Sequence, residues 1–447
     1  MKSELTSRLY WSAYTFLHAR REHQVPWRDL AATLATQRRR ALQIVRHASQ
    51  SVPFYRDTMQ ARGLRLQDFR GVEDLCRLPL IDARTYDQHP ARFRSTPPLG
   101  DSLSIRSSGT TGQSREFSYD ARAVFLAWAH DQRRRHIVAH RIGDKTGYRE
   151  LHLAADGGAP AQMDSFCEDH IWLPRGPEPT RQFLPPGSLT LEEETARINA
   201  FRPDVVRGNG SYVGALYRTL VRRGLPFHHP SIIVYAGDAM AAADRACLEN
   251  ELRIPVVSSY YSAEAPHIGY QCPSRHGFHL ALDSVAVRLI DPNGNDVAPG
   301  VPGEVVISNL TNRATVLLNY RLGDLAVLNP APCPCGRTLP VLELLEGRID
   351  ESLRLEDGRT LHASQILPRL RSAAGLNHIQ LIQQDARSYR LNAVAEGRID
   401  RARAESLLAS ELDALTGAPN QLSVEWVNAL PCEPNGKLRL VLSRLPA

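Results

Sequence analysis

The feature that most constrains the fold is an alternation of strand-like and helix-like segments through the middle of the chain. Residues 210–223 have the apolar spacing of a helix, residues 231–236 form the short apolar run of a buried strand, and residues 239–251 return to helical spacing. Strands that alternate with helices usually form a largely parallel sheet that is covered on both faces. We therefore expect an α/β fold whose large, multi-layer domain contains mostly parallel sheets.

The regions on either side follow other patterns. Apolar side chains at helical spacing predict a helical opening over about residues 1–60, which Pro53 should end. Residues 284–328 have the pattern of short strands broken by turns, with Pro-Asn-Gly and Pro-Gly as the turn signals. This second pattern predicts a small antiparallel subdomain.

The last hundred residues have the pattern of a separate α+β unit. They predict a hairpin around residues 357–358, a helix over 364–374, a strand over 379–383 and a helix over 400–415. The 447 residues also exceed the usual size of one domain. We therefore predict an N-terminal domain of residues 1–346 and a small C-terminal domain of residues 347–447.

Charge and cysteine content argue against several classes of protein. The net charge of +6 is spread as single arginines and short runs rather than as a basic stripe, which argues against nucleic acid as a partner. The N-terminus lacks the unbroken apolar core of a signal peptide, and no apolar run is long enough to span a bilayer. Seven cysteines, an odd number, argue against a disulfide framework. We expect a cytoplasmic monomer or homodimer with no membrane partner.

Residues 107–114, with the sequence SSGTTGQS, combine hydroxyl side chains with glycines. Such a segment can direct backbone N–H and side-chain O–H groups at phosphate oxygens, so it predicts a phosphate-binding loop. It is not the Gly-x-x-x-x-Gly-Lys-Ser/Thr loop, because both the lysine and the spacing are missing. A flexible Ser/Thr/Gly linker is the alternative interpretation.

Four further motifs follow this loop in order along the chain. They are YYSAE at residues 260–264, YRLGD at 320–324, GRID at 347–350 and PNGK at 434–437. Together with the loop, their order resembles the adenylate-forming superfamily of acyl-CoA synthetases and ligases. Within it, the sequence is most similar to the phenylacetate-CoA ligase-like and coenzyme F390 synthetase-like branch, including capsule-locus ligases. The resemblance covers nearly the whole chain and implies that a carboxylic acid is activated with ATP.

The resemblance implies a nucleotide site that contains magnesium. Glu264 would bind the Mg²⁺ ion, Asp324 would accept hydrogen bonds from the ribose hydroxyls, and Arg348 would assist Asp324. A metal and donor groups are needed there because negative charge builds up as pyrophosphate leaves. The other residues implied to contact ATP are Ser107, Ser108, Gly109, Thr110, Thr111 and Gly112 at the phosphates, and Gly237, Asp238 and Tyr261 near the adenine.

Two residues near the ends of the C-terminal domain carry further roles that the resemblance implies. Lys437 matches a lysine that contacts the carboxylate and the α-phosphate during adenylation, where a cation stabilises developing negative charge. Asp350 matches the hinge about which this mobile domain turns between adenylation and acyl transfer. Without the resemblance, Lys437 would be interpreted as a surface lysine in a turn.

A second group of residues is independent of the nucleotide. Cys272, His279, Cys333 and Cys335 offer three thiolates and one imidazole, a set that favours tetrahedral zinc. The Cys-x-Cys-Gly segment also resembles that of the same branch, so we expect a structural Zn²⁺ site. His276 competes with His279 as the fourth ligand, and unpaired buried cysteines can instead behave as small hydrophobic residues.

Two arginines leave questions open. Many relatives carry a lysine soon after the phosphate loop, whereas Arg115 stands in this chain. Arg207 begins a segment expected to line the acid pocket, and it could pair either with a second anionic group on the acid or with a structural carboxylate. The aromatic content of 7% gives no pocket signature, which leaves aryl, heteroaryl and aliphatic acids open.

These features predict an AMP-forming ligase that makes an acyl-adenylate and passes the acyl group to a thiol or an amine. CoA, a carrier-protein thiol and an amine all remain open as acceptors, because acceptor tunnels are built from surfaces rather than from short motifs. The alternative is a non-catalytic adenylate-binding or scaffold protein that keeps the fold. Retention of the metal-binding, ribose-binding and lysine positions favours the enzyme.

Overall fold

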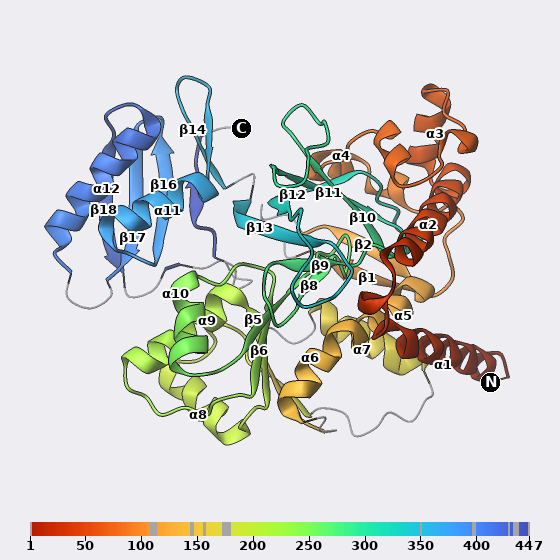
Figure 1. Cartoon of the computed structure of the whole chain (residues 1–447), viewed down its shortest axis with the longest axis horizontal. Coiled ribbons are helices and arrows are strands. Elements are labelled where there is room, and N and C mark those ends of the chain that lie inside the picture. Colours follow the sequence, from red (N-terminus) through yellow and green to blue (C-terminus); the bar gives the residue numbers. More distant parts are fainter. Residues whose placement is uncertain are drawn as a thin grey trace.

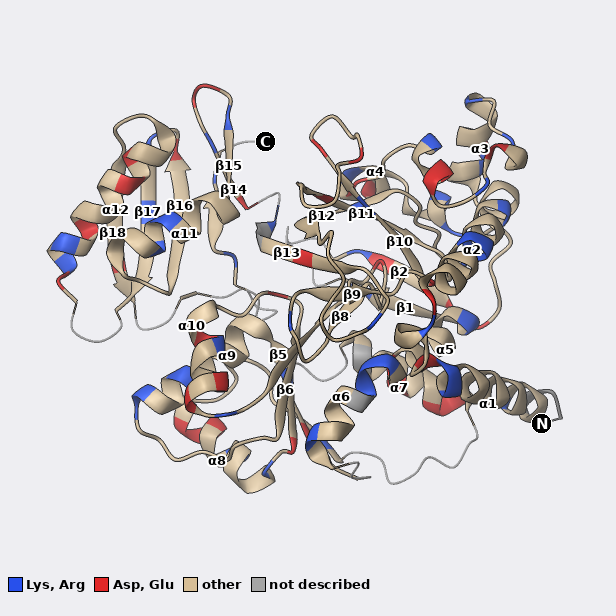
Figure 2. Ribbon diagram, in the orientation of Figure 1, with Lys and Arg blue, Asp and Glu red and all other residues tan. Residues whose placement is uncertain are grey.

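The computed structural model describes residues 2–107, 114–143, 147–154, 158–171, 180–348, 351–395, 399–427, 430–431 and 438–445. These residues form a large N-terminal part around one eleven-stranded sheet and a C-terminal part with a four-stranded sheet (Figure 1). Within the described ranges, no helix has both the length and the apolar character needed to cross a membrane. Figure 2 shows basic and acidic segments interspersed over both parts.

Three helices open the chain, as the apolar spacing predicts: α1 (Lys2–Glu22), α2 (Leu30–Ser51) and α3 (Pro53–Ala61). Asp29 caps α2, because its carboxylate accepts a hydrogen bond from the backbone N–H of Ala31 at 3.2 Å. The prediction that Pro53 ends this segment is wrong, since Pro53 begins α3. A proline is well tolerated at the first position of a helix, where its missing N–H would have no partner.

Five strands of the large sheet are parallel and lie in the order β7-β6-β5-β3-β4. Neighbouring residues of a strand pack on opposite faces: Val206 of β5 joins the core beneath α8 and α9, whereas Val205 packs against α6. Burial on both faces explains why these strands are almost continuously apolar. The elements are β3 (Arg149–Leu153), β4 (Thr180–Phe183), β5 (Val205–Asn209), β6 (Ile232–Ala236), β7 (Val256–Tyr260), α6 (Gln132–Ile142), α8 (Leu191–Phe201) and α9 (Gly210–Arg222).

The alternation predicted from the sequence is confirmed in this half of the sheet. Helix α9 and strand β6 end within one residue of their predicted boundaries. The helix predicted over residues 239–251 consists of α10 (Ala242–Ala246) followed by a π-helical turn (Cys247–Glu251).

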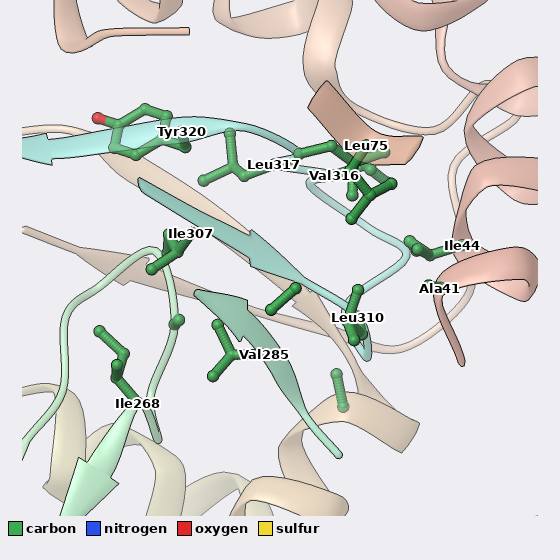
Figure 3. Close-up of a cluster of buried hydrophobic side chains, with 14 of the residues drawn as sticks. Ala41, Ile44, Leu75, Ile268, Val285, Ile307, Leu310, Val316, Leu317 and Tyr320 are labelled. Carbon is green, nitrogen blue, oxygen red and sulfur yellow. The ribbon is translucent and has the colours of Figure 1, made fainter. Parts of the chain in front are cut away.

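Beyond β7 the same sheet continues with antiparallel strands in the order β8-β9-β13-β12-β11-β10. The predicted fold class is confirmed, and the antiparallel strands join the parallel ones in one continuous sheet. Figure 3 shows part of the core beneath them, in which Ala41 and Ile44 of α2 join Val285 and Leu310. The strands are β8 (Gly269–Gln271), β9 (Phe278–Leu280), β10 (Val285–Ile290), β11 (Pro302–Asn309), β12 (Tyr320–Leu328) and β13 (Val341–Arg348).

A small antiparallel pair of strands, β1 (Ser102–Arg106) and β2 (Glu116–Asp120), brackets the predicted phosphate loop. The backbone N–H of Thr315 donates to the carbonyl of Ser118 at 3.0 Å, which ties β2 to the segment before β12. Along the chain, α4 (Ala83–Gln88) precedes these two strands, and α5 (Ala121–His130) and α7 (Ala159–His170) follow them.

The C-terminal part has its own core, in which apolar residues of α11 and α12 pack on a sheet of order β18-β17-β16-β19. The hairpin, helix, strand and helix predicted here are present as β14–β15, α11, β16 and α12. His378, just before β16, contacts Asp244 of α10 with an Nε2–Oδ1 distance of 3.1 Å and so links the two parts. The elements are β14 (Ser352–Arg354), β15 (Thr360–His362), α11 (Ala363–Ala374), β16 (Ile379–Asp385), β17 (Ser388–Val394), α12 (Arg401–Thr416), β18 (Gln421–Val427) and β19 (Val441–Ser443).

Candidate active site

A cleft of about 2450 Å³ lies where the parallel strands end, and residues of the C-terminal part form part of its lining. Side chains at the carboxyl ends of neighbouring parallel strands converge at one edge of a sheet, which is where ligands of open α/β sheets bind. All the predicted nucleotide-site residues that the structure describes line this cleft. They are Ser107, Gly237, Asp238, Tyr261, Glu264, Asp324 and Arg348.

Asp324 is held by one hydrogen-bond donor and one ion pair. The hydroxyl of Tyr260, at the end of β7, donates to Oδ2 of Asp324 at 2.7 Å, and Nε of Arg348 lies 3.2 Å from Oδ1. Asp324 and Arg348 are direct cross-strand partners on β12 and β13. Burial, reinforced by the Asp324 carboxylate, raises the pKa of Tyr260 well above its usual value, so this hydroxyl stays a donor. A carboxylate with one hydrogen-bond donor and one guanidinium neighbour retains acceptor sites for further hydroxyl groups.

Glu264 lies in a turn after β7 whose backbone is tied down on both sides. Nδ2 of Asn309 donates to the carbonyl oxygen of Glu264 at 3.0 Å, and the hydroxyl of Tyr119 donates to that of Ala263 at 2.7 Å. The Glu264 side chain is partly buried and lines the cleft. Burial raises the pKa of Tyr320, and the Glu264 carboxylate raises it further. A carboxylate oxygen at this place suits a hard cation such as Mg²⁺.

The base of the predicted phosphate loop is closed by hydrogen bonds. The backbone N–H of Ser107 donates to the carbonyl of Arg115 at 2.7 Å, and Oγ of Ser107 accepts from the N–H of Arg115 at 2.9 Å. The loop residues Ser108, Gly109, Thr110, Thr111 and Gly112 lie outside the described residues. The guanidinium of Arg115 makes two 2.8 Å bonds to Asp87 of α4, so the cation that replaces the family's lysine already pairs with a carboxylate.

Gly237 and Asp238 lie between β6 and α10 along the chain. Gly237 has a φ of +88°, a left-handed conformation that side chains rarely adopt. Asp238 accepts hydrogen bonds from the backbone N–H of Ser211, at 3.1 Å, and from its hydroxyl. The carboxylate therefore caps the first turn of α9, a structural role that the motif alone does not reveal.

The consecutive residues Tyr260 and Tyr261 meet different surroundings. The Tyr260 hydroxyl donates to Asp324, as described above, whereas the charges that act on the Tyr261 hydroxyl are Arg134, Arg207 and Asp131. Successive side chains of an extended segment point to opposite sides, which accounts for the difference. The Tyr261 hydroxyl thus lies beside a charged part of the cleft, and its place near the adenine stays a prediction.

Several charges of this part of the cleft belong to residues that motif analysis did not select. Asp131 and Arg134, at the start of α6, pair at 2.8 Å, and Nε2 of His267 lies 3.6 Å from Asp131. Nε of Arg207 donates to Glu150 of β3, whose side chain is only 2% exposed. The structure therefore favours a structural ion pair for Arg207. Sequence reasoning missed Asp131 and Arg134, because no motif marks residues that converge only in three dimensions.

The four residues of the predicted zinc site come together. One ligand atom from each of Cys272, His279, Cys333 and Cys335 lies within 4.8 Å of all the others. The Sγ atoms of Cys272 and Cys333 are 3.7 Å apart, close to the ~3.8 Å that Zn–S bonds of about 2.3 Å give in a tetrahedron. Nδ1 of His279 lies 3.1 Å from the carbonyl oxygen of Leu339, which leaves Nε2 to face the sulfurs. Among the described residues, the group includes His279 and not His276.

Lys437 and the hinge residue Asp350 lie outside the described residues. Their described neighbours nevertheless border the site. Leu438 and Arg439 line the cleft, and β13 ends at Arg348.

Comparisons with known proteins agree with this architecture. Residues 354–444 match the family model of the CapK C-terminal domain. The chain is 28% identical over 352 residues to the phenylacetate-coenzyme A ligase of Thermus thermophilus, which covers 74% of both chains. It is 20% identical over 352 residues to protein CapK of Staphylococcus aureus, which covers 77% of this chain and 74% of CapK.

A solved structure shares the fold over almost the whole chain. The 2-hydroxyisobutyryl-CoA ligase in its postadenylation state, bound to 2-HIB-AMP, has a TM-score of 0.72 at 17% identity and covers 94% of this chain and 91% of its own. The same ligase in its thioesterification state, with 2-HIB-AMP and CoA, has a TM-score of 0.59.

Proposed function

The chain is a relative of the phenylacetate-coenzyme A ligases and of CapK, with the fold of an adenylate-forming ligase, and on this premise we propose that it is an AMP-forming carboxylic acid ligase. The observation that carries the proposal is the arrangement around Asp324, a carboxylate fixed by Tyr260 and Arg348 in the same cleft as Glu264. The ribose hydroxyls would donate to Asp324. The loop that begins at Ser107 would hold the phosphates.

In the first step, an oxygen of the acid's carboxylate attacks the α-phosphorus of ATP. The bond from that phosphorus to the bridging oxygen breaks, and pyrophosphate leaves with the electron pair. Glu264 would hold Mg²⁺, which would offset the charge on the departing pyrophosphate. Lys437 would lie near the attacking carboxylate and the α-phosphate, where a cation stabilises the growing negative charge.

In the second step, a nucleophile attacks the acyl carbon and AMP leaves. We propose the thiol of CoA as the acceptor, because curated relatives that align with about three quarters of this chain are named as coenzyme A ligases. The C-terminal domain would turn about Asp350 between the two steps. A hinge there is supported by the end of β13 at Arg348 and the start of the next sheet, a separate one, at Ser352.

We also propose a structural zinc ion at the cysteine–histidine group. The S···S distance, the mutual proximity of all four ligand atoms and the orientation of His279 fit Zn²⁺. With four protein ligands the site would be closed, so the metal would stabilise the fold rather than contact substrate. It would link the end of β8 and strand β9 to the connection between β12 and β13.

Pyrophosphate release tests the proposed function directly. We expect the purified full-length protein to release pyrophosphate from ATP only when a suitable carboxylic acid is present, and faster still when CoA is added. The assay should cover aryl, heteroaryl and aliphatic acids, with simple amines as alternative acceptors. Measurable ATP binding without pyrophosphate release from any acid would instead support a non-catalytic adenylate-binding protein.

Asp324→Asn is expected to lower kcat/KM for ATP about 10- to 150-fold, because hydrogen bonds to a charged group contribute about 1.5–3 kcal/mol. The asparagine keeps the size of the side chain, so the loss should come from the charge. Asp357→Asn is the matched control, since Asp357 pairs with Arg359 at 2.6 Å on an exposed hairpin. Equal kcat/KM values for both variants would remove Asp324 from the ribose site.

A further inference from the structure

The part of the cleft beyond Tyr261 is lined by four charged side chains and a histidine, which come from several elements. Asp131 and Arg134 lie at the start of α6, Glu150 on β3, Arg207 on β5, and His267 between β7 and β8. We call these five residues the charged wall. Four of their side chains are only partly exposed, with exposed fractions of 42% for Asp131, 23% for Arg134, 22% for Arg207 and 25% for His267.

The charges of the wall are paired among themselves and with their neighbours. Arg134 bonds Asp131 through Nε and Nη2, at 3.1 and 2.8 Å, and donates to Oγ of Ser259 at 2.9 Å. Glu150 accepts from Arg207 and, at 3.1 Å, from Arg181 of β4. Each carboxylate of the wall thus has at least one guanidinium partner. The wall offers hydrogen-bonding groups without an unpaired charge of either sign.

The pKa values of Asp131 and His267 agree with a wall whose charges are paired. Against the effect of burial, Arg134 and His267 lower the pKa of Asp131 to about 2. Burial lowers the pKa of His267 to about 4, although Asp131 opposes this shift. At neutral pH the aspartate is therefore ionised, and the histidine is a neutral ring with one donor and one acceptor.

The wall lies on the side of the cleft into which the acyl part of a bound acid would extend under the proposed function. Tyr260 turns toward Asp324 and the nucleotide side, whereas Tyr261 meets the charges of the wall. In the proposed reaction the acid's carboxylate approaches the α-phosphate beside Asp324 and Glu264, so the rest of the molecule would occupy the cleft beyond Tyr261. Trp128, Val138 and Met163 line the same cleft and can contact a carbon skeleton.

The energetics of this surface distinguish classes of acid. A phenyl ring or alkyl chain against the wall would remove water from charged groups without replacing its hydrogen bonds, which costs about 1–3 kcal/mol for each unsatisfied group. Hydroxyl or amide groups would replace those hydrogen bonds. A second charged group on the acid would find no unpaired charge in the wall with which to form an ion pair.

We infer, on the basis of the proposed ligase function, that the activated acid is a polar one whose acyl part carries uncharged hydrogen-bonding groups, hydroxyl or amide, that contact the charged wall. The acid class of this enzyme therefore differs from purely aryl or alkyl acids. Asp131 and Arg134 would determine this specificity.

The test compares matched acids in the pyrophosphate-release assay with the full-length protein. The pairs are mandelate with phenylacetate, 3-hydroxybutanoate with butanoate, and succinamate with succinate. We expect the uncharged polar member of at least one pair to have a kcat/KM at least about tenfold higher, the value of one hydrogen bond to a charged group. Higher values for phenylacetate, butanoate or succinate throughout would overturn the inference and leave the ligase function standing. No release with any acid would overturn both.

A double variant tests whether the wall causes the preference for polar acids. Asp131→Leu with Arg134→Met should reduce the preference for the polar acid at least about fivefold, while the KM for ATP stays within about twofold. The matched control is Asp57→Leu with Arg92→Met, an exposed pair 3.0 Å apart that lies outside the cleft lining. An unchanged preference in a folded Asp131/Arg134 variant would show that the wall does not select the acid.

Discussion

Lys437→Ala is expected to slow acyl-adenylate formation by about 10²–10³-fold, the usual effect of removing one group that stabilises charge in the transition state. Acyl transfer from a preformed acyl-adenylate should change by less than about threefold, because on the proposed hinge motion the C-terminal domain would then present a different surface to the site. Of the 54 lysines and arginines in this chain only three are lysines, at positions 2, 145 and 437. A lysine in a chain that otherwise uses arginine fits a place that needs a compact point charge.

The measurement separates the two half-reactions. Pyrophosphate release without an acceptor reports adenylation, and CoA-dependent consumption of a synthetic acyl-adenylate reports transfer. Lys437→Arg keeps the charge but not the compact shape, so it should recover only part of the adenylation rate. Lys2→Ala serves as the control for loss of a lysine elsewhere. Equal loss in both half-reactions would contradict a role confined to adenylation.

Protein purified without added metal is expected to contain about one Zn²⁺ per chain, and Cys335→Ser should remove it. Because binding of structural zinc contributes on the order of 10 kcal/mol to folding in small zinc domains, its loss should lower the Tm by many degrees or abolish cooperative unfolding of the large domain. Metal analysis and thermal unfolding test both expectations. Cys76→Ser is the matched control, since Cys76 is exposed and lies outside the ligand group.

The opposite result would be equally clear. Metal-free protein in which alkylating reagents modify Cys333 and Cys335, with a Tm that a chelator does not change, would mean that the four residues pack as a small buried cluster. The adenylation reaction would not depend on the state of this cysteine–histidine group. Its sulfur atoms lie in the β8–β9 and β12–β13 connections and are not among the groups around Asp324.

Local pattern was sufficient for most of the elements. Residues 210–222, 232–236 and 401–416 form the elements that apolar periodicity predicts, because a segment buried on one or both faces must repeat its apolar residues with the period of its own backbone. Pro53 shows the limit of such reasoning. A proline can follow the end of one helix or occupy the first turn of the next, and the sequence pattern does not distinguish the two. In this fold Pro53 begins α3.

Motif order predicted residues of the cleft that lie far apart in sequence, including Ser107, Glu264 and Asp324. It could not predict how their neighbours are used. Asp238 caps a helix, Arg115 binds Asp87, and the hydroxyl of Tyr261 meets charges from α6 and β5. These contacts depend on which way each side chain leaves the backbone and on what another element places opposite it.

The sequence by itself therefore determined the α/β class, the elements of the C-terminal part and two sets of residues that the fold brings together, one in the cleft and one in the cysteine–histidine group. Periodicity and residue chemistry are local properties, so they can be recognised without knowing the fold. Only the tertiary structure decided that Arg207 belongs to Glu150 and that Asp131, Arg134 and His267 form one wall with them. Pairing of charges is a property of distance in space, and strands and helices far apart in sequence set those distances.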